Sequence, residues 1–199
     1  MAALAAVALA VPAARAEDAP PRHQALLLLR VLAYDRNLKQ RVGASAVVLV
    51  LYKAGDLGSE SRRGSIRTAF EEVAREVVVS GLDVRVEELA YRSAAEMEDR
   101  VEALRPALAY LDRALEGSLP EITRVTRSHR ILSADGSRSM VDGGVALGIV
   151  ARGGRAVVLV NLPAARQEGA DLDAALLSVA EVLRGEGEAS RAREREERR

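Results

Sequence analysis

Apolar positions along the chain fall into two kinds of pattern that follow one another in turn. Runs rich in aliphatic residues predict strands at 44–53, 82–91, 106–112 and 131–135. Between them, apolar stripes at helical spacing predict helices at 23–43, 65–78, 93–105 and 118–130. Strands that alternate with helices are typical of a parallel sheet covered on both faces. The pattern therefore predicts a three-layer, doubly wound α/β fold with a mostly parallel sheet.

Two further apolar runs, 145–151 and 156–160, flank the pair Gly153-Gly154. Two adjacent glycines supply the positive φ angles of a tight hairpin turn, so we expect an antiparallel edge hairpin near the C-terminus. The stretch "GGVALG" only superficially matches a dinucleotide-binding fingerprint, because it leads into a strand and not into a helix. Asn161 is expected to cap a short helix that Gly169 ends, and Asp171 to cap a last helix over 171–184.

The two ends of the chain have the composition of segments outside the fold. Residues 2–11 are apolar, and the small-x-small triplet Ala14-Arg15-Ala16 follows, which is the pattern of a signal peptide over 1–16 cleaved after Ala16. We expect a linker at 17–22, one α/β domain over 23–184, and a charged, disordered tail at 185–199. The leader predicts an exported, periplasmic protein that does not span the membrane after cleavage.

Composition narrows the possible chemistry. Lys and Arg together number 29, as do Asp and Glu, so no basic surplus favours nucleic-acid binding. The chain has no Cys and only two His residues, His23 and His129, which excludes thiolate chemistry and a His-rich zinc site. Ser128 and Asp135 lie near His129 in sequence, but closeness along the chain sets no triad geometry. We therefore expect no catalysis, no metal and no cofactor.

Polar side chains gather where three predicted strands end. Ligands of open α/β sheets bind in the crevice beyond the carboxyl ends of the strands, where phenol and cationic groups could hold a small amphipathic or anionic ligand. The alternative is that each Tyr packs its ring at a strand end and leaves its hydroxyl in water. The candidate ligand-binding residues are Tyr52, Lys53, Tyr91, Arg92, Tyr110 and Asp112.

Four segments together resemble the YfiR/HmsC-like family of exported bacterial proteins. They are 25–41, the strand "VVLVLYK", "RILSADGS" at 130–137, and the block from Asp142 through the hairpin into the last helix. The resemblance covers roughly 24–184. The positions that match the family pattern are Gly143, Gly144, Asn161, Ala165, Leu176, Leu177 and Ala180.

The resemblance implies a periplasmic, non-enzymatic regulator that binds the periplasmic sensing domain of a membrane diguanylate cyclase and lowers cyclic-di-GMP output and biofilm formation. It also implies a homodimer. The chain departs from better-known members, because it lacks their cysteine pairs and carries "YDRNL" at 34–38 where many have aromatic residues and a Trp-Pro.

Two functions from different classes follow. The first is a binding protein that acts through protein–protein contact, with a surface centred on the hairpin because edge strands offer unpaired backbone groups. The second is a small-ligand sensor that uses the strand-end crevice and resembles one lobe of a transport binding protein. The residues assigned to the interaction surface or its motif are Asp142, Gly143, Gly144, Val157, Leu159 and Asn161.

Overall fold

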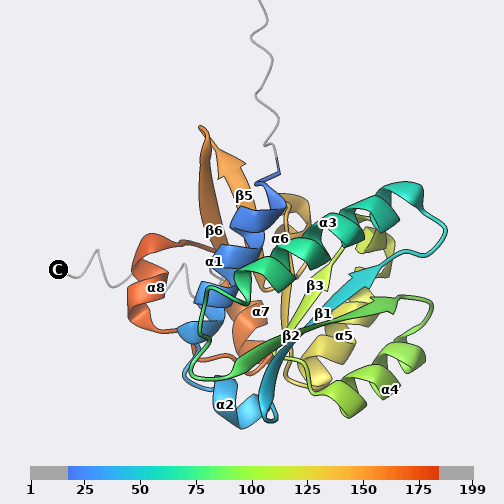
Figure 1. Ribbon diagram of the computed structural model, residues 1–199, viewed down its shortest axis with the longest axis horizontal. Helices are drawn as coiled ribbons and strands as arrows, with labels where there is room; N and C mark the ends of the chain where they lie inside the picture. The colour runs from blue at the N-terminus through green and yellow to red at the C-terminus, as the bar shows by residue number, and fades with distance from the viewer. Residues whose placement is uncertain (1–17, 184–199) are drawn as a thin grey trace, which may run out of the picture.

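A computed structural model describes residues 18–183, and its core is a sheet of seven strands in the order β2-β1-β3-β4-β5-β6-β7 (Figure 1). Strands β1 to β5 are parallel to their neighbours, β5 and β6 are antiparallel, and β7 is parallel to β6. The mostly parallel α/β sheet predicted from the sequence is confirmed. The strands are β1 (Ser45–Tyr52), β2 (Asp83–Ala90), β3 (Leu108–Leu111), β4 (Leu132–Asp135), β5 (Leu147–Arg152), β6 (Arg155–Asn161) and β7 (Glu181–Leu183).

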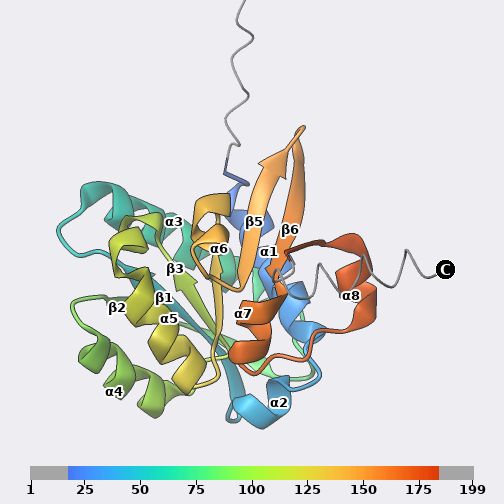
Figure 2. The ribbon, with the colours of Figure 1, turned by 180° about the vertical axis from the view of Figure 1, so that it is seen from behind.

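Helices cover both faces of the sheet. Alternate strand residues point to opposite faces, and both sets are apolar, so each face needs a covering layer. In β1, Val48 and Val50 face a core shared with α1 (Pro21–Ala33) and α3 (Leu57–Val73). Leu49 and Leu51 face a second core, shared with α4 (Ala94–Leu104) and α5 (Leu119–Ser128). Figure 2 shows these two helices on the side of the sheet that faces the viewer. The helices α7 (Leu162–Gln167) and α8 (Ala174–Val179) join the first core, and α6 (Arg138–Asp142) contributes Met140 to the second.

The glycine-paired segment forms the predicted hairpin. Its register runs from Leu147 opposite Val160 to Arg152 opposite Arg155, and the turn residues Gly153 and Gly154 have φ angles of +56° and +75°. The tip projects beyond the rest of the sheet (Figures 1 and 2). No phosphate-binding strand-to-helix turn forms there, as the sequence pattern indicated.

The sequence analysis did not predict β7. This strand pairs with residues 159–161 of β6, so it covers the outer side of only part of the hairpin. Glu181 in β7 forms ion pairs with Arg138 at 2.6 Å and with Arg152 at 2.7 Å, which fasten the strand to α6 and to the hairpin. The outer edge of β6 from Arg155 to Val158 has no strand partner among residues 18–183.

Two predicted helices have different bounds. The helix expected at 23–43 is divided into α1 and α2 (Leu38–Arg41), because the backbone at Asp35 leaves the helix to form a bridge with Leu172. The helix expected at 65–78 begins earlier, at Leu57, where the side chain of Asp56 accepts a hydrogen bond from the Ser59 amide. The glycines and serines of 58–65 disfavour a helix by propensity, but the cap and the sheet contact outweigh them.

The C-terminal helix expected at 171–184 is also shorter than predicted. It covers only Ala174–Val179, its cap is Asp173 and not Asp171, and the chain then extends into β7. The short helices η1 (Arg113–Ser118) and α6 were not predicted. The predicted caps Ser93 and Asn161 are confirmed, since their side chains accept hydrogen bonds from the amides of Glu96 and Ala164.

The predictions for the two ends of the chain lie largely outside the described residues. The leader at 1–16 and the charged tail at 185–199 are both in that part. Of the linker expected at 17–22, Asp18 and Pro20 are exposed, Ala19 is buried, and Pro21 begins α1. Within the part that the structure describes, no helix combines the length and apolarity needed to cross a membrane.

Candidate functional site

A pocket opens at the carboxyl edge of the sheet, next to the point where the strand order reverses. The chain places β2 on one side of β1 and β3 on the other, and such a switch point is the usual ligand crevice of an open α/β sheet. The pocket has a volume of about 210 Å³ and lies beyond the carboxyl ends of β3 and β4. We call it the crevice pocket. Its polar lining residues include Gln24, Arg62, Tyr110, Asp112, Arg113 and Asp135.

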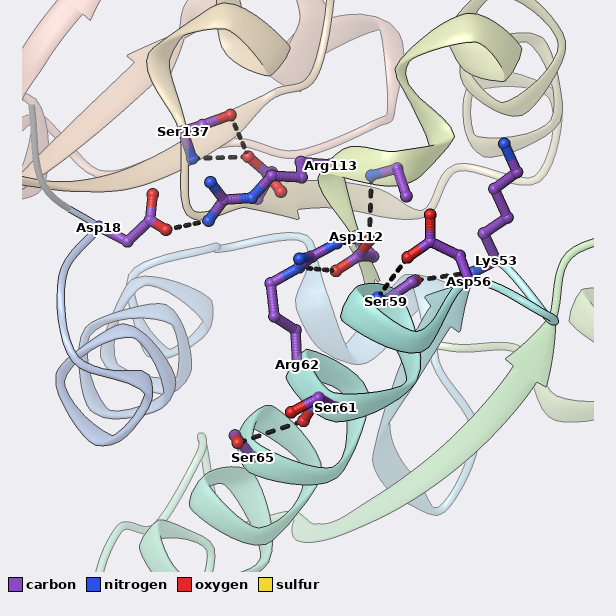
Figure 3. A network of polar contacts seen from close by, with 12 residues as sticks. Asp18, Lys53, Asp56, Ser59, Ser61, Arg62, Ser65, Asp112, Arg113 and Ser137 are labelled. Atoms are coloured by element: carbon purple, nitrogen blue, oxygen red, sulfur yellow. Dashed lines mark hydrogen bonds and ion pairs between the residues drawn. The ribbon is translucent and has the colours of Figure 1, made fainter. Parts of the chain in front are cut away.

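Asp112, directly after β3, is held by Arg62 of α3. The guanidinium donates two hydrogen bonds to the carboxylate, of 2.7 Å from Nε and 2.8 Å from Nη2, and Figure 3 shows the pair. The Ala114 amide donates a third, of 2.9 Å. Burial alone would raise the pKa of Asp112, but these hydrogen bonds and the Arg62 charge lower it below the ordinary value. Asp112 is therefore an ionised and fully paired carboxylate.

Tyr110 forms the floor of the pocket together with Gln24 of α1. Its hydroxyl donates a 2.7 Å hydrogen bond to Gln24 Oε1, and Gln24 Nε2 donates one of 2.6 Å to the Ala19 carbonyl. Complete burial raises the pKa of Tyr110 well above that of a free phenol, so the group remains neutral. A Cβ added at Gly136 would lie 2.7 Å from Gln24 Oε1, so a larger residue there would displace the Gln24 side chain.

Asp135, the last residue of β4, differs from Asp112 in having no cationic partner. Ser137 donates two hydrogen bonds to its Oδ1, each of 2.6 Å, one from the amide and one from the hydroxyl. The residue is 3% exposed. Burial raises the pKa of Asp135 to about 6, although the Ser137 hydrogen bonds and the Arg113 charge oppose the shift. Near neutral pH the carboxylate is thus largely ionised.

Residues 18–21, which we call the strap, border the pocket on the side of α1. Asp18 forms an ion pair with Arg113 of η1, visible in Figure 3, and its backbone bridges to Val150 of the hairpin. Ala19 is buried in the first core. The strap thus links the first helix, the hairpin and the loop after β3.

A second polar group, the basal cluster, lies toward the amino end of β4. The buried carboxylate of Asp35 pairs with Arg41 and also accepts hydrogen bonds from the amides of Asn37 and Asp171. Glu168, after α7, accepts hydrogen bonds from Thr126 Oγ1 (2.6 Å), from Ser133 Oγ (2.7 Å) and from the Ser133 amide (2.8 Å). Burial raises the pKa of Glu168 to about 7 despite these hydrogen bonds.

The predicted ligand-binding residues divide into two groups. Tyr110 and Asp112 line the crevice pocket, whereas Tyr52, Lys53, Tyr91 and Arg92 do not. Tyr52 lies under the guanidinium of Arg63, 4.9 Å from the ring centre. The backbone amide of Lys53 donates a hydrogen bond to Ser59 Oγ, and the Lys53 ammonium points away from the Arg62–Asp112 pair (Figure 3).

The pair after β2 makes contacts with helices instead of the pocket. Tyr91 donates a 3.0 Å hydrogen bond to Glu121, and burial together with this hydrogen bond raises the pKa of Tyr91 to about 12. Arg92 donates to Glu96 at 2.9 Å on the first turn of α4. The predicted six residues therefore do not form one site.

The residues assigned to the interaction surface have mixed positions. Val157 is half-buried on the hairpin, whereas Leu159 is fully buried against Val141 and Val150. Asn161 caps α7 and also donates a hydrogen bond to the Val141 carbonyl. The other three end α6: Asp142 is exposed near Arg138, Gly143 is the cap, and Gly144 has a φ of +114°.

Four of the six polar residues named above for the pocket were not predicted from the sequence. Asp135 could have been found, since it ends a predicted strand as Asp112 does, and the same crevice rule applies to it. Arg113 directly follows Asp112 and could have been predicted by the same rule. Gln24 and Arg62 had no such signal, because Gln24 was one polar residue of a helix and Arg62 fell in a segment expected to be a loop.

The residues of the possible Ser128–His129–Asp135 triad do not share one pocket. His129 caps the end of α5 and lines a different pocket, with Arg41 and Arg130, so it does not meet Asp135. Among residues 18–183, no group of His, Cys, Asp and Glu residues is arranged to hold a metal ion. The chemistry available in the crevice pocket is binding by charge and hydrogen bonds.

Comparison with solved structures shows the fold. The chain is similar to the ABC domain from Streptococcus pneumonia solved in complex with L-Trp, with 15% identity and a TM-score of 0.57, covering 83% of this chain and 63% of that one. It is equally similar to a conserved domain protein from Vibrio cholerae, with 14% identity and a TM-score of 0.57, covering 84% and 61%. The chain thus spans less than two thirds of the length of either structure.

Comparison by sequence gives the family. No curated protein matches the chain. The sequence pattern of the YfiR/HmsC-like family matches residues 24–181, from the first helix to the last strand, which confirms the resemblance drawn from the sequence. This is a family of regulatory, non-catalytic proteins. The chain belongs to the YfiR/HmsC-like family.

Proposed function

We propose that this protein is an exported regulator that binds the periplasmic sensing domain of a membrane diguanylate cyclase and holds it inactive. The observation that carries the proposal is the family match over 24–181, which includes every strand of the sheet except the end of β7. The predicted leader at 1–16 supports delivery to the periplasm.

The crevice pocket supports a binding role over a catalytic one. Two of its polar groups are held by partners, Asp112 by Arg62 and Tyr110 by Gln24, so neither the Asp112 carboxylate nor the Tyr110 phenol is free to act as a nucleophile or base. A base or nucleophile needs a partner within hydrogen-bond reach and a place for the reacting atom. A regulator needs only a surface whose affinity differs between two conformers of its partner.

The surface that we assign to the partner is the outer side of the β5–β6 hairpin. From Arg155 to Val158 the edge of β6 lies beyond the reach of β7, so its outward backbone groups can pair with an added strand. Val157 is half-buried there, beside the exposed turn at Gly153-Gly154. Binding that favours the inactive conformer of the cyclase would lower its output by a shift in populations.

The test is a Val157→Lys variant in a binding assay with solubilised membranes and then with the purified periplasmic domain that is captured. A lysine on this edge opposes strand addition, so we expect at least about tenfold weaker binding. The matched control is Val78→Lys, since Val78 is 75% exposed and lies after α3, away from the hairpin. Leu159→Lys is unsuitable, because a charge at this fully buried position would disrupt the fold.

Two outcomes contradict the proposal at different levels. Capture of a membrane protein without a cyclase domain would reject the assigned partner. Equal binding by wild type and Val157→Lys, with unchanged melting temperatures, would reject the hairpin as the contact surface while leaving the partner in place.

A further inference from the structure

The charges around the crevice pocket do not cancel one another. Asp112 is neutralised by the two hydrogen bonds from Arg62, and Asp18 of the strap is neutralised by Arg113. The remaining charged group of the lining is Asp135, which forms no ion pair with any residue of 18–183. The pocket therefore holds one excess negative charge.

This excess charge is buried, and no ion pair with a residue of 18–183 compensates it. Ser137 donates two hydrogen bonds to Oδ1 of Asp135, the Gly136 amide and the Arg113 charge also favour the ionised form, and a carboxylate has about four acceptor sites on its two oxygens. A buried carboxylate without a cation is costly, and structures normally compensate it with a pair or a bound ion. Here the residue borders a cavity, so a ligand can supply the missing cation.

The walls of the pocket limit the shape of that ligand. About 210 Å³ corresponds to roughly seven water molecules at their share of liquid volume, which suits a small organic molecule. Ile66 of α3 and the strap residues Ala19, Pro20 and Pro21 provide the apolar part of the lining. The lining of the pocket thus combines one acidic group with an apolar surface.

We propose that the crevice pocket binds a small primary ammonium ligand, whose cation donates hydrogen bonds to the Asp135 carboxylate and whose short apolar body lies against Ile66 and the strap. An anion is disfavoured, because Arg62 and Arg113 already hold carboxylates and Asp135 repels a negative charge. The proposal concerns this pocket alone and does not depend on which protein the chain binds.

The pKa of Asp135 agrees with this assignment. Burial raises it to about 6, so the carboxylate carries its charge near neutral pH and a bound cation would lower the pKa again. The groups that face Asp135 are Arg113 and Asp112 beyond β3, Tyr110 in β3, and Arg62 in α3. None of them supplies an unpaired cation.

The experiment uses three probes of matched size and different charge: butylammonium, butanol and butyrate. Each is titrated into the purified protein by calorimetry at neutral pH. We expect saturable binding of butylammonium with a Kd on the order of 1 mM, a value suited to so small a ligand, and no saturable binding of butyrate or butanol. Absence of butylammonium binding by the wild type would overturn the proposal.

The Asp135→Asn variant separates recognition from folding. Asn keeps an oxygen that can accept the Ser137 hydrogen bonds and removes the charge, so we expect an unchanged or higher melting temperature and at least about tenfold weaker butylammonium binding. Asp142→Asn is the matched control, since Asp142 is an exposed aspartate outside the pocket. Equal butylammonium binding by wild type and Asp135→Asn, or preferred binding of butyrate, would refute the proposal.

Discussion

The protein buries carboxylates in two regions and treats them differently. In the basal cluster, Asp35 has Arg41 and two backbone amides as partners, and Glu168 has two hydroxyls and an amide. In the crevice pocket, Asp112 is paired with Arg62, whereas Asp135 has hydrogen bonds from Ser137 and the more distant charge of Arg113 but no ion pair.

The difference indicates which region maintains the fold and which is available for binding. The basal cluster connects segments that are distant in sequence, the turn after α1 with residue 171 and α5 with the end of α7, so its carboxylates act as fixed ties. The crevice pocket is a cavity beyond the carboxyl ends of β3 and β4, and its Asp135 carboxylate forms no ion pair among residues 18–183. Substitutions should therefore reduce stability most in the basal cluster and affect binding most in the crevice pocket.

The largest effect on stability is expected for Arg41→Met. Both side chains of the Asp35–Arg41 pair are at most 1% exposed, and removal of one partner leaves a buried charge uncompensated. The free energy of unfolding in urea should fall by about 3–5 kcal/mol. Arg36→Met is the control, because Arg36 is 60% exposed and solvent screens its ion pair with Asp173, so the unfolding free energy should change little. Equal losses in the two variants would contradict the structural role of the basal pair.

A smaller, pH-dependent effect is expected for Glu168→Gln. The native pKa is raised from 4.5 to about 7, so the folded state binds a proton that the unfolded state has released. Wild-type stability should therefore fall as pH rises from 4.5 to about 7, by an amount on the order of 2–3 kcal/mol. Gln carries no charge, so the variant should lack this part of the decline.

The measurement is urea unfolding of both proteins at several pH values. Glu168→Gln should be more stable than the wild type above pH 7 and similar to it near pH 4.5. The opposite order, with the wild type gaining stability over the variant as pH rises, would show that Glu168 is stabilised as an anion.

The smallest effect on stability is expected in the crevice pocket, for Arg62→Leu. The Arg62 side chain is 40% exposed, so solvent screens its pair with Asp112, which also keeps the Ala114 amide as a donor. A loss of about 1 kcal/mol is expected in urea unfolding. The released Asp112 carboxylate should also strengthen butylammonium binding in the calorimetric assay. A loss of unfolding free energy as large as that of Arg41→Met would contradict the view that the basal cluster stabilises the fold more than the crevice pocket does.

The sequence was most informative where local pattern and tertiary structure agree. The alternation of apolar runs and stripes predicted the parallel strands and their helices, and Gly153-Gly154 predicted the turn. The sequence pattern did not predict β7, because "AEVL" at 180–183 continues a leucine-rich stripe of helical spacing. Pairing with β6 is what makes this segment a strand. The pattern also failed for the start of α3, where a cap outweighs poor propensity.

The pocket was only half predictable for a related reason. The crevice rule locates side chains at strand ends, and two of the residues that it indicated, Tyr110 and Asp112, line the pocket. It does not determine which way a strand-end side chain turns, so Tyr52 and Tyr91 were grouped with a pocket that they do not line. Gln24 and Arg62 reach the pocket from helices, and only the packing of α1 and α3 on the sheet places them there.

The late position of β7 along the chain has a consequence for biosynthesis. Until Glu181–Leu183 has been made, the backbone of β6 at 159–161 is an uncovered strand edge next to a finished core. Such edges promote self-association of nascent or truncated chains. A premature stop just before this strand should therefore yield an aggregating product rather than a slightly weakened protein, and the yield of soluble protein should depend on a segment that adds little to the apolar core.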